Sequence, residues 1–371
     1  MKAKVLITGM AGLLGSNFSR HLLAEGYDVV GIDDFSGGYK ENLADGAKCV
    51  NINLADLEAV DRFFRDEKPD YVYHFAAYAA EGLSPFIRKY NYTNNLICSA
   101  NLITSSINHD VKKFIFTSSM ATYGRENTPP FTEDMQPKPL DPYGVAKYAV
   151  EMDLKLAKEQ FGLSYSIIRP HNIVGKYQNI WDRYRNVVGI WIRKAMHNEP
   201  LTIFGDGLQT RAFSDVKYYF KPFEQLMYEY DGEIFNLGAD KERTILEAAE
   251  LVRKCAGNFG FKPDIVHYEP RHEAKFAFCN HDKAKKLLGF RDDFVQFVLL
   301  DVQVFLSFFQ GFCALCSFSR FLLFLCSKLF DSFIAKLHFQ SLEFDFFAQE
   351  VVLTVVAYIL LLFLVFCDRS F

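Results

Sequence analysis

The chain has 371 residues and a formal net charge of −4, with 41 Lys and Arg residues against 45 Asp and Glu residues. This length is enough for two domains, each with its own hydrophobic core. The balanced charge lacks the basic footprint that nucleic-acid-binding proteins carry. Eight cysteines without a framework of regular spacings predict a reducing compartment rather than a disulfide scaffold.

The first residues enter an apolar strand pattern at once, with no secretory n-region or cleavage site. We therefore expect a cytoplasmic protein. Cys313 and Cys316 form a lone CxxC motif without a second pair. In a Cys-rich segment, chance explains this spacing better than a zinc or redox site does, so no metal is expected.

The composition changes near residue 291. Up to Phe290 the chain has regular turn signals, whereas residues 291–371 are rich in Phe, Leu and Cys, with no proline and one glycine, Gly311. Residues 351–367 are apolar apart from Thr354, a run at the short end of the length that spans a membrane. This tail is either a membrane anchor or a product of translation out of the ancestral frame. The scarcity of turn residues favours the second interpretation.

The chain opens with the pattern of a βαβ unit. Residues 5–7 form a short apolar run, as in a buried parallel strand. A glycine-rich turn at residues 8–15 leads into an amphipathic helix that ends at about Glu25. Residues 28–32 then form a second predicted strand.

The glycine-rich turn has the spacing of a dinucleotide-binding turn. Gly9 permits the tight turn, Gly12 lets the backbone approach a pyrophosphate, and Gly15 lets the helix pack closely on the strand. The phosphates would lie at the N-terminus of the helix, where free N–H groups and the helix dipole favour anions. Asp33 is placed to accept hydrogen bonds from both ribose hydroxyls. Because a carboxylate there repels a 2′-phosphate, NAD is favoured over NADP.

Strands and helices continue to alternate along the chain. Further strands are predicted at residues 49–51, 71–75, 113–117 and 165–169, and helices at residues 57–67, 94–106 and 143–161. This order predicts an α/β fold, a Rossmann-type doubly wound parallel sheet with helices on both faces. Ligands of such sheets lie beyond the carboxyl ends of the strands, where Ser118 and Ser119 follow the strand at 113–117.

The regular alternation loosens after Pro170. The remaining predicted elements are a helix at 186–198, a strand at 201–204, a helix that begins with a Thr244–Glu247 capping box, and a helix at 282–288. We expect a dinucleotide-binding domain at residues 1–172 and a smaller α/β substrate-binding lobe, mainly at residues 173–290. The boundary is approximate, because such lobes often return strands to the first domain.

Tyr143 and Lys147 lie at the start of a predicted helix, after an N-cap candidate, Asp141, and a proline suited to the first helical position. Four residues apart, they share one helix face. An ammonium beneath a phenol would lower a pKa that is about 10 in free tyrosine, so Tyr143 could accept a proton near neutral pH. A solvated helix face could show the same pair, so the surrounding motifs must decide.

Several further motifs occur in order over residues 1–290. They are Thr8-Gly9-x-x-Gly12-x-x-Gly15, Asp33, His74-Phe-Ala-Ala77, Asn95, Ser118-Ser119 with Tyr123-Gly124, Tyr143-x-x-x-Lys147, Arg169-Pro-x-Asn172 and Gly205-x-Gly207-x-Gln209-x-Arg211. Together they resemble the extended short-chain dehydrogenase/reductases, and among them the nucleotide-sugar epimerase branch. The resemblance implies NAD as cofactor, a UDP-sugar as substrate, and a homodimer formed through the helices at 94–106 and 143–161.

The resemblance also implies roles for individual residues. Ser119 would hydrogen-bond the sugar 4-hydroxyl, Tyr143 would act as the base, and Lys147 would hold the nicotinamide ribose. The implied cofactor-binding residues are Gly9, Gly12, Leu13, Leu14, Gly15, Asp33, Asn53, Leu54, Phe75, Ala76, Ala77, Asn95, Tyr143 and Lys147. Substrate would be bound by Ser119 and Tyr143, and its phosphates by Asn172, Arg211 and Arg271.

Two positions after Ser119 distinguish the branches that the family contains. The related dehydratases carry an Asp-Glu pair there and the decarboxylases a glutamate, whereas this chain has Met120 and Ala121, which cannot transfer protons. Epimerisation needs only the groups that remain. Lys217 departs from the family, which usually has an aspartate there.

The expected function is NAD-dependent epimerisation at C4 of a UDP-hexose, most simply UDP-glucose and UDP-galactose. UDP-glucuronate or a UDP-N-acetylhexosamine is the alternative substrate. A non-catalytic NAD-binding regulator on the same fold is the alternative class, although such a protein would be expected to lose the Ser119, Tyr143 and Lys147 set. Roles within residues 177–185 could not be assigned, and His74 and His171 are expected to support the structure.

Overall fold

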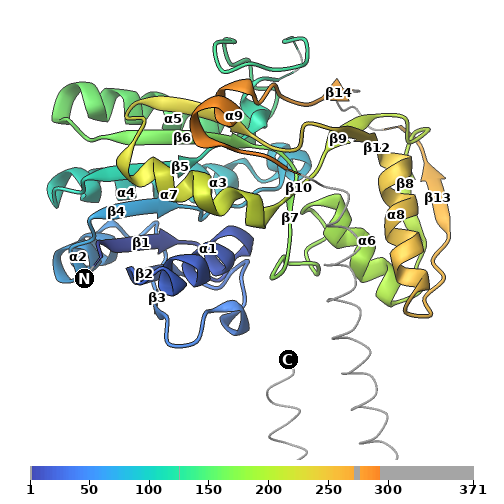
Figure 1. The fold of residues 1–371 in the computed structure, drawn as a ribbon, viewed down its shortest axis with the longest axis horizontal. Coiled ribbons are helices and arrows are strands. Elements are labelled where there is room, and N and C mark those ends of the chain that lie inside the picture. The colour runs from blue at the N-terminus through green and yellow to red at the C-terminus, as the bar shows by residue number, and fades with distance from the viewer. Residues whose placement is uncertain (1, 125, 271–275, 293–371) are drawn as a thin grey trace, which may run out of the picture. The chain divides into compact units, whose positions relative to one another are not determined.

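The computed structural model describes residues 2–124, 126–270 and 276–292. Its centre is a sheet of seven strands, all paired in parallel. The strand order across the sheet is β11 (Glu233–Leu237), β6 (Tyr165–Pro170), β5 (Lys113–Thr117), β4 (Tyr71–His74), β1 (Lys4–Thr8), β2 (Asp28–Asp33) and β3 (Lys48–Asn51) (Figure 1). The predicted doubly wound parallel sheet is confirmed.

Helices cover both faces of this sheet, because successive residues of each strand point to opposite faces. Val5 and Ile7 of β1 pack with α1 (Leu13–Ala24), α7 (Phe220–Tyr228) and α9 (Asp282–Leu288). Leu6 between them faces α2 (Leu57–Glu67), α4 (Cys98–Asn108) and α5 (Pro142–Phe161). The strand centres are therefore buried on both sides, and functional groups can reach solvent only at the strand ends.

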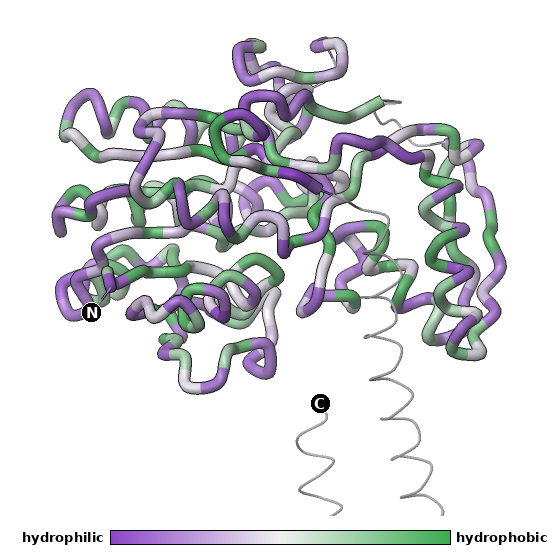
Figure 2. The backbone as a smooth tube through the Cα atoms, viewed as in Figure 1, coloured by the Kyte–Doolittle hydropathy of each residue, from purple (hydrophilic) through white to green (hydrophobic). Residues whose placement is uncertain are grey.

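A second core lies beside the carboxyl ends of the strands. It is formed by α6 (Val187–Met196) and α8 (Ile245–Gly257), with the parallel pair β8 (Leu201–Phe204) and β13 (Ile265–Tyr268). Hydrophobic and hydrophilic residues alternate along α8, which buries one face on α6 (Figure 2). The predicted capping box at Thr244 and Glu247 is present at the start of α8.

Short strands link this second core to the main sheet. β12 (Glu242–Thr244), β9 (Thr210–Ala212) and β14 (Phe276–Ala277) form one small sheet, and β7 (Ile173–Val174) pairs with β10 (Ser214–Asp215). The chain then returns to the main sheet, where α7, β11 and α9 complete the fold. The described residues between 173 and 290 thus contribute to both cores.

The helix predicted at 94–106 belongs to a longer helical stretch. It begins with a 3₁₀ turn (Glu81–Phe86) and α3 (Arg88–Tyr92), passes through a π-helical segment (Thr93–Ile97), and continues as α4 to Asn108. Within the described residues, no helix is both long enough and apolar enough to cross a bilayer. The hydrophobic tail, including residues 351–367 and the cysteines at 313 and 316, lies outside the described part of the chain.

Candidate active site

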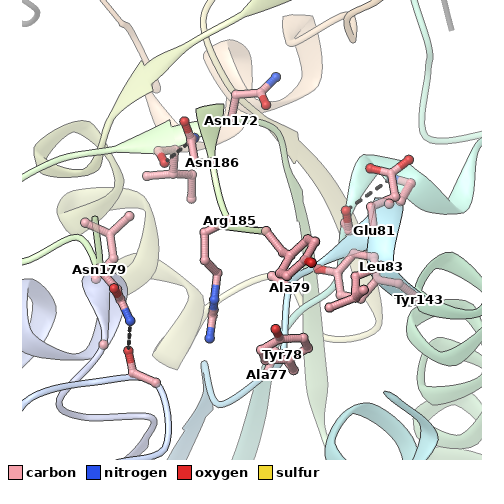
Figure 3. A pocket seen from close by; sticks show the side chains of 18 of the residues that line it. Ala77, Tyr78, Ala79, Glu81, Leu83, Tyr143, Asn172, Asn179, Arg185 and Asn186 are labelled. Atoms are coloured by element: carbon pink, nitrogen blue, oxygen red, sulfur yellow. Dashed lines mark hydrogen bonds between the residues drawn. The ribbon is translucent and has the colours of Figure 1, made fainter. Parts of the chain in front are cut away.

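A cavity of about 1620 Å³ lies between the carboxyl ends of the main-sheet strands and the second core. Figure 3 shows Tyr143 and Glu81 on one side of it, with Asn172, Asn179 and Asn186 facing them. Most residues predicted for cofactor, substrate and catalysis line this cavity: Gly9, Gly12, Leu13, Leu14, Asp33, Asn53, Leu54, Phe75, Ala76, Ala77, Ser119, Tyr143, Lys147, Asn172 and Arg211. Residues distant in the sequence therefore converge on one crevice.

The glycine turn after β1 has the shape that a dinucleotide requires. Gly9 has φ +67°, and a Cβ there would lie 2.8 Å from the backbone of Ala76. Gly12 is the N-cap of α1 and lines the cavity. A Cβ on Gly12 would meet one atom within 4 Å beyond its chain neighbours, Gly9 O at 3.3 Å. The backbone of Gly12 is thus open to the cavity at the helix N-terminus, where phosphate oxygens are bound.

Gly15 and Asp33 complete this turn in different ways. A Cβ on Gly15 would lie 2.2 Å from Gly9 O, so Gly15 lets α1 pack closely on the turn after β1, where packing on the strand itself was expected, and it does not line the cavity. Asp33 accepts hydrogen bonds from Ala11 N at 2.9 Å and Phe35 N at 2.7 Å. Burial raises the pKa of Asp33, and these two amides oppose the rise. The turn and the carboxylate at the end of β2 together fit NAD.

The catalytic candidates meet because α5 starts against the loop after β5. Asp141 caps α5 by accepting from Tyr143 N at 2.9 Å and Gly144 N at 3.0 Å. A Cβ on Gly144 would lie 2.7 Å from Ala121 O, so the helix start and the Ser119–Ala121 turn touch through their backbones. This contact brings Ser119 and Tyr143 to the same part of the cavity wall.

Ser119 and Tyr143 both lie in the cavity wall, and the Ser119 hydroxyl acts on the pKa of the Tyr143 phenol. Burial raises the pKa of Tyr143, and the nearby negative charges of Glu81 and Asp141 raise it further. The hydrogen bond with Ser119 acts in the opposite direction. Both hydroxyl groups line the same cavity, so both are candidates for exchanging a proton with a bound ligand.

Lys147 is not among the groups that dominate the pKa of Tyr143, and burial raises this pKa where a lowered value was expected. Its ammonium donates to Thr117 O at 2.8 Å and lies 5.9 Å from the centre of the Tyr143 ring. Burial lowers the pKa of Lys147 to about 7, and the charge of Glu151 opposes the fall. Tyr143 and Lys147 share a helix face, as predicted. The carbonyl of Thr117 nevertheless holds the Lys147 ammonium, and burial is the largest influence on the pKa of Tyr143.

A buried ion pair supports this wall from behind. Glu151 lies one helical turn after Lys147 and accepts from Arg169 Nε at 2.9 Å and Nη2 at 2.6 Å. Both side chains are at most 3% exposed. Ser118 donates to the same carboxylate. The pair joins α5 to β6 and to the end of β5, the two elements that present Tyr143 and Ser119.

Some predicted residues lie behind the wall rather than in it. Asn95 is buried and brackets the backbone of Tyr78, accepting from its N–H at 3.0 Å and donating to its carbonyl at 3.1 Å. His74 bonds Thr8 and Ser99. His171, which was expected to be structural, lines the cavity but contacts His281 and the carbonyl of Ala212.

The facing wall presents the polar groups predicted to bind substrate. Asn172 has a positive φ of 40° and donates to Ala212 O at 3.2 Å, and Arg211 donates to Thr210 O at 2.8 Å. Lys217, which departs from the family pattern, pairs with Asp215 at 2.9 Å. Arg271 lies outside the described residues.

Sequence reasoning missed several residues of the cavity. Tyr78 and Glu81 follow β4, while Asn179 and Arg185 belong to the segment whose roles could not be assigned. The signal for Tyr78 was its position just beyond the carboxyl end of a parallel strand. For Arg185 the sequence contained only an arginine within an irregular polar loop.

Comparison with known proteins agrees with this geometry. Residues 5–238 match the NAD dependent epimerase/dehydratase family. The chain is 30% identical over 291 residues to a putative UDP-glucose 4-epimerase of Methanocaldococcus jannaschii, a match that covers 78% of this chain and 93% of that protein.

Solved structures show the same fold. A UDP-glucose 4-epimerase of Thermotoga maritima with UDP-glucose has a TM-score of 0.78 and 31% identity, covering 82% of this chain and 99% of the other. A UDP-N-acetylglucosamine 4-epimerase of Methanobrevibacter ruminantium, in complex with UDP-N-acetylmuramic acid, has a TM-score of 0.75 and 28% identity, covering 82% and 98%. The predicted family and the predicted cofactor, NAD, are confirmed. By its sequence, its sheet and its glycine turn, the chain belongs to the NAD dependent epimerase/dehydratase family.

Proposed function

We propose that this NAD-dependent epimerase inverts C4 of a UDP-hexose through a transient 4-keto sugar, with UDP-glucose and UDP-galactose as the simplest pair. The observation that carries the proposal is the Ser119–Tyr143 pair beside Met120 and Ala121. All four residues line the cavity, and only the first two can exchange a proton with a ligand. Inversion needs one proton-transfer group, whereas elimination of water needs further acids.

The proposed mechanism assigns each residue a task. Ser119 hydrogen-bonds the 4-hydroxyl, and Tyr143 removes its proton and later returns it. Lys147, held at Thr117 O, would bind the nicotinamide ribose and set the position of the cofactor beside the sugar. The chemistry that NAD supplies when bound is reversible acceptance of the C4 hydride, so no net cofactor turnover is expected.

The wall that faces Tyr143 would bind the nucleotide part of the substrate. Asn172 and Arg211 line that side of the cavity, and their amide and guanidinium groups suit phosphate oxygens. The cavity exceeds the 300–1,000 Å³ typical of a site for one small ligand, which supports simultaneous binding of a dinucleotide and a sugar nucleotide. Relatives that act on UDP-glucose and on UDP-N-acetylglucosamine share this fold, so the second sugar remains the principal alternative substrate.

The test is direct assay of the full-length protein. Incubation with UDP-glucose and no added NAD should produce UDP-galactose, detected by proton NMR of the anomeric region. Tyr143→Phe removes the proton-transfer group and should lower kcat by at least roughly 100-fold, while NAD stays bound. The matched control is the neighbouring, partly buried Tyr148, whose hydroxyl accepts from Gln136 and which does not line the cavity. Tyr148→Phe should leave kcat within about twofold.

The outcomes separate the competing functions. If UDP-glucuronate or UDP-N-acetylglucosamine is converted in place of UDP-glucose, the mechanism stands and the substrate is corrected. If NAD binds but no sugar nucleotide is converted, the proposal fails and the alternative of an NAD-binding regulator gains support.

We also propose that the protein is a homodimer formed through the helical stretch that ends in α4 and through α5. Large apolar side chains on these elements are exposed, namely Ile97, Met152, Leu156 and Phe161. Exposed apolar side chains on two neighbouring helical elements suit an interface between two chains. Light scattering should give the mass of two chains, and a single-chain mass would exclude the dimer.

A further inference from the structure

Residues 177–185 form a loop, here called the strap, that crosses from the second core to the loop after β2. Asn179 donates to Gly37 O at 3.0 Å and accepts from the Tyr39 hydroxyl at 3.1 Å. Asn42 donates to Tyr177 O at 3.2 Å. Three hydrogen bonds therefore fasten the strap over the loop that follows Asp33.

The same contacts reach the glycine turn. Asn42, which holds the strap, also donates to Ala11 O at 3.0 Å. Gly38 packs tightly against Ala11, because a Cβ on Gly38 would lie 2.5 Å from Ala11 C. The strap is thus tied, through one intervening side chain, to the turn that fits the dinucleotide phosphates.

Arg185 at the end of the strap extends into the cavity (Figure 3). Its Nε donates to Asp182 Oδ2 at 3.1 Å, which fixes the side chain to its own loop. The guanidinium carbon lies 4.9 Å from the centre of the Tyr78 ring, and Nη2 lies 2.6 Å from where a Cβ of Gly37 would be. Within the described part of the chain, no hydrogen bond is made by either Nη atom.

The strand order locates this guanidinium. Gly37 follows β2 and Tyr78 follows β4, and β1 lies between these two strands in the sheet. A group that touches both flanking loops must pass over the carboxyl end of β1, where Gly9 and Gly12 form the phosphate-binding turn. A guanidinium matches two phosphate oxygens with parallel hydrogen bonds.

We propose that Arg185 binds the diphosphate of the bound dinucleotide from the side opposite the glycine turn, so that the strap clasps the cofactor. The glycine turn would present backbone N–H groups to one side of the diphosphate and Arg185 two Nη donors to the other. Two other anions could reach Arg185, namely the diphosphate of the sugar nucleotide and the carboxylate of a hexuronate. Its place over β1 favours the dinucleotide, and measurement of each ligand separately distinguishes them.

The experiment compares full-length Arg185→Gln, Arg185→Lys and wild type, each freed of cofactor, by calorimetric titration with NAD and separately with UDP. Arg185→Gln should raise the Kd for NAD roughly 10- to 100-fold and leave the Kd for UDP within about twofold. Arg185→Lys keeps the positive charge but loses the two parallel donors of the guanidinium. Its Kd for NAD should therefore lie between those of wild type and Arg185→Gln. The matched control is Lys176→Gln, which removes one charge beside the strap from a side chain outside the cavity.

Unaltered NAD affinity in Arg185→Gln would overturn the proposal. A raised Kd for UDP with unaltered NAD binding would overturn the proposal and assign the guanidinium to the sugar nucleotide. A raised Kd for UDP-glucuronate, titrated in the same way, with unaltered NAD and UDP binding would overturn it and assign the guanidinium to a carboxylate. If Lys176→Gln weakens NAD binding equally, the effect is general electrostatics and the assignment fails. Because titration with NAD needs no turnover, the result does not depend on whether the proposed epimerase activity is found.

Discussion

The two walls of the cavity are built from different kinds of structure. The sheet wall consists of strand ends and the first turn of α5, and its reactive groups are held by buried neighbours, with Tyr143 8% and Lys147 2% exposed. The opposite wall consists of short strands and loops, in which Asn172 and Tyr177 have left-handed backbone conformations. Its polar side chains are partly exposed.

This difference corresponds to two requirements of the proposed chemistry. Proton transfer depends on the position of a few atoms, which buried packing and hydrogen bonds fix best. A wall that admits and releases a nucleotide sugar must open to solvent, and loops provide that. If the comparison holds, substitutions in the sheet wall should cost folding stability, whereas substitutions in the opposite wall should mainly cost ligand affinity.

The largest effect is expected from the buried pair behind the sheet wall. Glu151→Ala leaves Arg169 charged, buried and without its carboxylate, so the free energy of unfolding should fall by about 3–5 kcal/mol. Chemical denaturation of the full-length protein measures this change. Glu250, which pairs with Arg253 while both side chains are nearly half exposed, is the matched control.

Glu250→Ala should change the free energy of unfolding by less than about 1 kcal/mol, because solvent screens an exposed pair. Equal losses in the two variants would show that the sheet wall is not held by its buried charges.

The second prediction concerns the pH dependence that Lys147 imposes. Burial lowers its pKa to about 7 in the folded protein, whereas an unfolded lysine titrates near about 10.4. Between these values the unfolded state binds more protons, so the contribution of Lys147 to stability improves as the pH rises. Below about pH 7 the full cost of burying the charge is present.

Lys147→Met removes this dependence. The stability of the variant relative to wild type should therefore fall as the pH rises, on the order of 1 kcal/mol per pH unit between about pH 7 and pH 9. Thermal unfolding in matched buffers follows the trend. The control is Lys176→Met, at an exposed position, whose stability should change with pH in the same way as that of wild type. If the stability of Lys147→Met also follows wild type at every pH, the pKa of Lys147 is not lowered.

Much of the sheet wall could be predicted because its signals are local. The spacing of Gly9, Gly12 and Gly15 encodes a turn directly, and Asp141 and Pro142 mark the start of the helix that carries Tyr143. The rule that ligands lie beyond the carboxyl ends of parallel strands then placed Ser119 in the same crevice.

The rest depends on contacts between distant segments. β11 pairs with β6 at the edge of the sheet, and the residues of β11 alone do not predict this partner. The strap depends on Asn179 meeting Gly37, more than a hundred residues away. The pKa of Tyr143 was misjudged because its helix neighbour was visible in the sequence, whereas the burial that dominates its titration was not.

The smallest effect on stability is expected in the opposite wall, at Asn172. Its φ of +40° is tolerated by Asn and Gly but disfavours Ala by about 1 kcal/mol, so Asn172→Ala should be less stable than Asn172→Gly. Both variants lose the carboxamide that would contact a substrate phosphate. If that contact exists, both should raise the Kd for UDP by a similar factor, roughly 5- to 10-fold, despite their different stabilities. Calorimetric titration with UDP would reveal the opposite result, normal affinity in Asn172→Gly, which would mean that Asn172 shapes the backbone and does not bind the nucleotide.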